Sequence, residues 1–154
     1  MIEKYAGRDI AVFMSKAFQI DIDRRSQSPF VIFQGQKEHD DLPVKKAQHY
    51  IESNYKEKVT VDNIASLCAL SRRNLERRFK KATSNSIAEY LQRVRVEAAK
   101  MSLESQSENV SEVMYKVGTD TKAFRGTFKR ITGLSPIEYR NKYNRELAVA
   151  GRVA

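Results

Sequence analysis

A run of basic side chains at residues 72–81 is the feature of this sequence that suggests chemistry most directly. Six of these ten residues are Arg or Lys, and Glu76 is the single acid among them. Arginine can form a bidentate bond to the guanine edge in the DNA major groove, and a glutamate can accept a hydrogen bond from cytosine. The run therefore predicts recognition of nucleic acid. A solvated helix face, with Glu76 paired to Lys80 one turn later, is the alternative interpretation.

The positive charge of the whole chain is concentrated around this run. The 154 residues include 28 basic and 19 acidic side chains, which gives a net charge of +9. Residues 43–143 hold 20 bases and 11 acids, whereas the net charge is −1 over residues 1–42 and +1 over residues 144–154. We therefore expect a polyanionic partner to bind the middle segment. A basic surface that only favours solubility is the alternative.

The sequence lacks the patterns of an enzyme or a metal protein. His39 and His49 belong to no H-E-x-x-H motif, and we find neither a nucleophile elbow nor a glycine-rich phosphate loop. A metal could bind at His39 with Asp40 and Asp41, but a solvated loop is the simpler explanation. We therefore expect no catalytic residues, no cofactor and no bound metal.

The sequence also indicates a cytoplasmic protein without a membrane partner. The single cysteine, Cys68, excludes an internal disulfide, and we expect it to be a small core residue. No apolar run approaches the roughly 20 residues that span a bilayer. Charged residues interrupt the N-terminal segment where a signal peptide would be apolar.

Helical periodicity predicts that the basic residues lie in an all-α domain. The apolar spacing predicts seven helices, at about 43–55, 61–68, 72–82, 87–104, 110–117, 121–131 and 136–143. Asn109 with Glu112, Ser86 with Glu89, and Ser135 with Glu138 have the form of capping boxes. An additional N-terminal helix is predicted at 2–18, followed by a linker to residue 42 with a short extended piece at 30–33. We divide the chain into an N-terminal extension (1–42), the helical domain (43–143) and a tail (144–154).

The helical domain contains an internal repeat with an offset of 49 residues. Ten positions fall in register without a gap, and most of them are identical. The pairs are Val61/Val110, Ala65/Met114, Ala69/Gly118, Leu75/Phe124, Phe79/Phe128, Lys80/Lys129, Thr83/Thr132, Ser86/Ser135, Glu89/Glu138 and Tyr90/Tyr139. One supersecondary unit is therefore used twice.

Each copy has the features of a helix-turn-helix. Such a unit needs a turn residue that tolerates a crowded or left-handed backbone, and an apolar anchor on its second helix. Ala69 and Leu75 fill these places in the first copy, and Gly118 and Phe124 fill them in the second. The outward faces then carry Arg73, Glu76, Arg77 and Lys80 in one copy and Thr121, Lys122, Arg125 and Lys129 in the other. We expect phosphate contacts from Arg72, Arg78, Lys80, Lys81, Lys116, Lys129 and Arg130.

The predicted helix 87–104 would act as a rigid connection between the two units. At 1.5 Å per residue it spans about 27 Å, which is compatible with two recognition helices about one DNA turn, roughly 34 Å, apart. Arg95 on this helix could contact phosphate or form an internal salt bridge. We expect Tyr90 and Tyr139 to pack in the core, with base stacking as the alternative.

Four segments resemble a known family. They are ASLCALSRRNLERRF at 65–79, SIAEYLQRVRVEAAKMSLE at 86–104, VMYKVG at 113–118 and FRGTFKRITGLSPIEYR at 124–140. Together they are similar to the DNA-binding domain of the AraC/XylS family of bacterial transcription regulators, over about residues 43–143. The resemblance implies that helices 72–82 and 121–131 enter the major groove of double-stranded DNA, and RNA polymerase is a candidate partner. By position, it implies base contacts from Arg73, Glu76, Arg77, Thr121, Lys122 and Arg125.

Two departures from that family concern the second unit. The segment after Gly118 is one residue shorter than usual, with Thr119 in place of an aromatic residue. Gly126 stands where the family usually has an arginine, and a glycine inside a helix costs about 1 kcal/mol relative to alanine. We therefore expect the first unit to dominate recognition.

The N-terminal extension resembles a different family. Residues 2–34, through EKYAGRDIAVFMSKAF and RRSQSPF, look like the tail of the PfpI-like, glutamine-amidotransferase-like domain that precedes some AraC-type regulators. The resemblance implies a longer regulator whose upstream domain senses an effector and dimerises.

The competing interpretation of the whole chain is a helical adaptor that binds acidic proteins or RNA. Such an adaptor would bind operator DNA and random DNA equally well.

Overall fold

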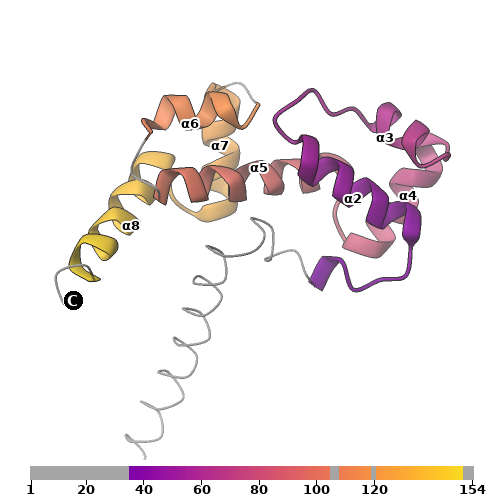
Figure 1. Cartoon of the computed structure of the whole chain (residues 1–154), viewed down its shortest axis with the longest axis horizontal. Coiled ribbons are helices and arrows are strands. Elements are labelled where there is room, and N and C mark those ends of the chain that lie inside the picture. Colours follow the sequence, from indigo (N-terminus) through magenta and orange to yellow (C-terminus); the bar gives the residue numbers. More distant parts are fainter. Residues whose placement is uncertain (1–34, 105–107, 119–120, 151–154) are drawn as a thin grey trace, which may run out of the picture. The chain divides into compact units, whose positions relative to one another are not determined.

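The computed structural model describes residues 35–104, 108–118 and 121–150, and it describes side chains as far as residue 143 apart from that of residue 121. Seven α-helices and no strands occur in this part of the chain (Figure 1). They are α2 (Leu42–Asn54), α3 (Val61–Leu67), α4 (Arg72–Thr83), α5 (Ile87–Glu104), α6 (Val110–Lys116), α7 (Thr121–Thr132) and α8 (Pro136–Ala150). The all-α prediction is confirmed, and the predicted helix 2–18 and extended piece 30–33 lie outside the described residues.

One helix boundary differs clearly from the prediction. We predicted that the last helix ends at residue 143, but α8 continues to Ala150. The added residues, NRELAVA, contain Arg, Glu, Leu and two Ala, which favour helix without any apolar period. The predicted tail therefore begins as a continuation of α8.

The sequence repeat is also a repeat of helix packing. The main helix–helix contacts among α2, α3, α4 and α5 each have a counterpart three helices later, among α5, α6, α7 and α8. Helix α5 is thus the last helix of the first unit and the first helix of the second, and Figure 1 shows it running between the two groups of helices. The predicted role of this helix as a connection is confirmed.

Equivalent tyrosines hold the two ends of this arrangement. Tyr90 on α5 is fully buried, makes an edge-to-face contact with Phe79 at 5.4 Å, and donates to Glu52 of α2 at 2.7 Å. Tyr139 on α8 packs in the same way against Phe128 at 5.5 Å and donates to Glu104 of α5 at 2.6 Å. The prediction that both tyrosines are packing residues is confirmed.

The repeat extends to the backbone of the turns. Ala69 has φ 53° and Gly118 has φ 74°, so both helix-turn-helix turns use a left-handed residue at the predicted position. The recognition helices also end on left-handed residues 49 apart, Ser84 with φ 60° and Gly133 with φ 80°. Helix starts are capped as predicted: the side chain of Asn109 accepts from Glu112 N, and the Glu112 side chain accepts from Asn109 N.

The loop between α2 and α3 of the first unit also packs against the shared helix α5 and against the second unit. Arg95 on α5 donates through Nε to the carbonyl of Tyr55 at 2.8 Å and through Nη2 to that of Glu57 at 3.1 Å. Gly118 of the second unit packs so closely on this loop that an added Cβ would lie 2.1 Å from the carbonyl oxygen of Lys56. The side chain of Arg95 therefore has an internal role, but its partners are carbonyl groups rather than the carboxylate of a salt bridge.

The end of the predicted linker belongs to the folded domain. The carbonyl of Gln36 accepts from Gln48 Nε2 at 3.0 Å, and Lys37 pairs with Glu52 at 2.8 Å. His39 bonds the side chain of Gln48, which is 1% exposed. Gln36, Lys37 and His39 of the predicted linker therefore bond to α2 through polar groups, and such bonds leave no helical period in the sequence.

Candidate nucleic-acid interface

Helix α4 packs on its neighbours through two buried apolar side chains and has an N-cap at its first turn. Leu75 and Phe79 are fully buried against neighbouring helices. The Ser71 side chain accepts from Asn74 N at 3.3 Å and so satisfies one of the free donors at the helix start. The opposite face then projects into solvent, and there Arg73, Glu76 and Arg77 are exposed as predicted.

The acidic residue on this face pairs with a different partner from the one considered. Glu76 accepts from Arg72 Nε at 3.2 Å, whereas Lys80 was the proposed partner. Arg72 also contacts Asp62 at 3.4 Å, and all three side chains are largely exposed. Exposed pairs of this kind are worth about 0–1 kcal/mol, so the pair with Arg72 holds Glu76 only weakly.

Arg77 has a neighbour on the same helix that orients it. Its Nη2 donates to Asn74 Oδ1 at 3.0 Å, one turn earlier on α4. Asn74 was not among the predicted site residues, although its spacing of three from Arg77 is the signal that could have identified it. Lys80 and Lys81 follow on the exposed side near the end of α4.

Arg78 lies differently from the other basic residues of α4. Its Nε and Nη2 donate to the two carboxylate oxygens of Asp41 at 2.8 and 2.9 Å, and 32% of its side chain is exposed. The bonds to Arg78 hold the pKa of Asp41 below its usual value and raise that of Arg78. The predicted phosphate ligand is thus already in a bidentate ion pair within the protein.

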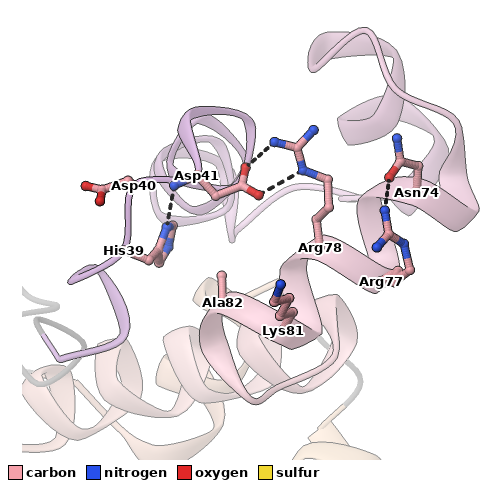
Figure 2. A pocket seen from close by; sticks show the side chains of 8 residues that line it. All are labelled: His39, Asp40, Asp41, Asn74, Arg77, Arg78, Lys81 and Ala82. Atoms are coloured by element: carbon pink, nitrogen blue, oxygen red, sulfur yellow. Dashed lines mark hydrogen bonds and ion pairs between the residues drawn. The ribbon is translucent and has the colours of Figure 1, made fainter.

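A hollow lies beside this ion pair at the exposed face of α4. It has a volume of about 560 Å³, and Figure 2 shows the side chains that line it. Asp41 and Arg78 face each other across its upper edge, whereas Arg77 and Asn74 bond to each other nearer the start of α4. The lining residues are His39, Asp40, Asp41, Asn74, Arg77, Arg78, Lys81 and Ala82.

The second recognition helix repeats the design of the first. Phe124 and Phe128 of α7 are buried, and Lys122, Arg125 and Lys129 are exposed. Among the predicted phosphate ligands, Arg130 donates to Gln92 of α5 at 3.0 Å and Lys116 pairs with Glu108. The side chain of Thr121, also a predicted base contact, lies outside the described part.

Gly126 leaves a gap in the exposed face of α7. The residue is exposed, and an added Cβ would have no neighbour within 4 Å. No steric reason therefore requires glycine here. A side chain that could reach DNA is missing from the middle of this helix, which is consistent with a weaker second unit.

Cys68 and His39, which the sequence offers as reactive or metal-binding groups, form hydrogen bonds within the protein. Cys68 is half-buried at the end of α3 and its thiol donates to the carbonyl of Pro43 at 3.3 Å, and burial raises the pKa of this thiol. His39 Nδ1 accepts from Asp41 N at 3.2 Å. In the described part of the chain, no three His, Cys, Asp or Glu residues are grouped to hold a metal ion, and no helix is long and apolar enough to cross a bilayer.

Comparison with known proteins finds relatives of the helical domain. A family model described as a helix-turn-helix domain matches residues 64–142. The chain is 35% identical over 92 residues to the bifunctional transcriptional activator/DNA repair enzyme AdaA of Bacillus subtilis, covering 59% of this chain and 44% of that protein. It is 34% identical over 100 residues to the Msm operon regulatory protein of Streptococcus mutans, covering 64% and 36%. The chain thus spans less than half the length of either relative.

Solved structures of two regulators have a similar fold. The C-terminal domain of AraT, a response regulator from Geobacillus stearothermophilus, has a TM-score of 0.63 at 29% identity, covering 66% of this chain and 86% of that one. The DNA-binding domain of AdpA, a global transcriptional factor solved in complex with a target DNA, has a TM-score of 0.64 at 30% identity, covering 68% and 95%.

Proposed function

Because the chain belongs to the helix-turn-helix family of AraC-type DNA-binding domains, we propose that it binds duplex DNA sequence-specifically as part of a transcriptional regulator, with α4 and α7 in the major groove. The observation that carries this proposal is the repeated design of the two recognition helices. Each begins after a left-handed turn, buries aromatic or apolar anchors on one side, and presents exposed basic residues on the other.

The first unit supplies most of the sequence reading in this proposal. Arg73 and Arg77 bond guanine edges, and Glu76 accepts from a cytosine after releasing Arg72. In the second unit the proposed base contacts come from Thr121, Lys122 and Arg125. Gly126, which is 49 residues after Arg77, offers no side chain. Phosphate contacts come from residues around both helices: Arg72, Lys80, Lys81, Lys116, Lys129 and Arg130.

Further properties of the whole regulator are part of the proposal. We infer that the region acts by binding and has no catalytic role, although one relative, AdaA, is described as bifunctional. The resemblance of residues 2–34 to a PfpI-like domain favours an upstream domain that senses an effector and dimerises. RNA polymerase is the proposed protein partner.

A selection of genomic DNA fragments by the 154-residue chain at near-physiological salt tests the proposal. One enriched motif is expected. Arg77→Ala should weaken binding to that motif by about 1–3 kcal/mol and relax the preference at one base pair. Lys122→Ala should weaken it less, because the second unit reads DNA more weakly. Equal binding to selected and random duplexes would instead favour the adaptor function and contradict sequence-specific regulation.

A further inference from the structure

The ion pair between Asp41 and Arg78 joins two segments that are far apart in the sequence. Asp41 lies immediately before α2, whereas Arg78 lies in the middle of α4, 37 residues later. Both guanidinium donors face carboxylate oxygens, at 2.8 and 2.9 Å. This fork-to-fork geometry is the strongest form of an arginine–carboxylate contact.

Other bonds fix the position of Asp41 independently of Arg78. Its Oδ1 accepts from Val44 N at 3.1 Å and caps α2, and its backbone N donates to His39 Nδ1 at 3.2 Å. His39 is in turn bonded to the buried side chain of Gln48. The carboxylate is therefore held in place before any DNA approaches, and it cannot follow Arg78 toward a phosphate.

Neighbouring cations on α4 are differently placed. Arg73, Arg77 and Lys81 are exposed, and within the part of the chain that the structure describes none of them pairs with a carboxylate. Arg72 pairs with the largely exposed carboxylates of Asp62 and Glu76, whereas Arg78 pairs with the partly buried carboxylate of Asp41, the N-cap residue of α2. Moving Arg78 to a phosphate would break two charge-assisted hydrogen bonds and leave Asp41 close to the DNA.

We propose that Asp41 is a specificity-determining residue, because it holds Arg78 away from the DNA backbone and so lowers affinity for DNA of any sequence. The proposal rests on the proposed function of DNA binding. A phosphate contact adds affinity without sequence information, so withholding one increases the share of binding that comes from base reading by Arg73 and Arg77. In this proposal Arg78 is not itself a phosphate ligand, in contrast to the expectation from the sequence.

Asp41→Asn in the 154-residue chain is the central variant. Asparagine caps a helix as well as aspartate does, so α2 keeps its cap while the negative charge is removed. Asp40→Asn is the matched control: it changes the net charge equally, one residue away, at an exposed side chain. Circular dichroism and thermal unfolding establish that each variant is folded before binding is compared.

The measurement is affinity for a random-sequence duplex across a range of salt concentrations. In Asp41→Asn the released Arg78 should tighten binding about threefold to tenfold at fixed salt and steepen the slope of log K against log salt by about one. Asp40→Asn should leave the slope unchanged. The ratio of affinities for the selected motif and random DNA should fall in Asp41→Asn alone. If the two aspartate variants behave alike, the proposal is overturned.

Arg78→Met supplies a second, independent arm. In the wild-type background it should leave the salt slope unchanged, and in the Asp41→Asn background it should return the slope to the wild-type value. A slope reduced by about one in the single Arg78→Met variant would show that Arg78 binds phosphate despite Asp41. That result would overturn this inference but leave the proposed function of DNA binding intact. Absence of any salt-dependent DNA binding by the wild-type chain would overturn the proposed function as well.

Discussion

Asp41 also makes the stability of the domain depend on pH. The hydrogen bonds from Arg78 are the largest cause of the lowered pKa of Asp41, and burial opposes them. The hydrogen bond from Val44 N and the positive charges of Arg78 and His39 lower this pKa further. A depressed folded-state pKa means that the ionised carboxylate favours the native state. This contribution is complete well above pH 3.8, the ordinary value, and it is lost as the pH falls through the lower folded value.

We therefore expect Asp41→Asn to lower the free energy of unfolding by about 0.5–1 kcal/mol at pH 7, because the pair is partly exposed. The difference from wild type should shrink as the pH falls below about 4. Urea unfolding at pH 7, 4 and 2 measures it, with Asp40→Asn as the reference variant. A penalty of equal size at pH 7 and pH 2 would mean that the lost ion pair is not its cause.

At the scale of one helix, Gly126 makes a specific prediction about α7. It lies in the exposed interior of a helix, and an added Cβ meets no atom within 4 Å. Gly126→Ala should raise the free energy of unfolding by about 0.5–1 kcal/mol, since alanine loses less backbone entropy in a helix.

Gly133→Ala is the matched control: its surroundings are equally open, but its φ of 80° is left-handed. It should lower the free energy of unfolding by about 1–2 kcal/mol in the same denaturation experiment. If both substitutions change the stability in the same direction, the argument fails.

The elements could be predicted from the sequence because their signals are local. Capping residues and apolar spacing fall within one or two turns, and the offset of 49 residues relates one unit to the other without reference to the fold. The bonds of residues 36–41 could not be predicted in this way, because their partners lie far along the chain. Asp41 before Pro43 is a cap signal, but nothing in the sequence pairs it with Arg78. The exposed faces of α4 and α7 followed from their buried anchors, whereas the choice of Arg72 as the partner of Glu76 depends on side-chain geometry.

At the scale of the described domain, the two units should unfold together. They share α5, and the turn at Gly118 in the second unit packs on the Lys56 backbone in the first. Gly118→Ala should therefore lower the free energy of unfolding by more than about 2 kcal/mol, because a left-handed alanine is strained and its Cβ would collide with a carbonyl group. Hydrogen exchange should speed up in α3 and α4 as well as in α6 and α7.

Ala69→Gly is the control at the equivalent turn of the first unit. Its φ of 53° already strains an alanine, so glycine should be neutral or mildly stabilising there. Faster exchange confined to α6 and α7 in Gly118→Ala would show that the units are energetically separate.

The shared helix α5 has a consequence for how such a protein can evolve. A new DNA target can be acquired by changes on the outer faces of α4 and α7, and these faces can diverge separately because their side chains project into solvent. Helix α5, with buried residues such as Val94 and Leu103, packs against helices of both units, so its packing cannot be altered for one unit alone. Duplication of a helix-turn-helix around a common helix therefore lets the two recognition helices diverge separately, while the helices that support them must evolve together.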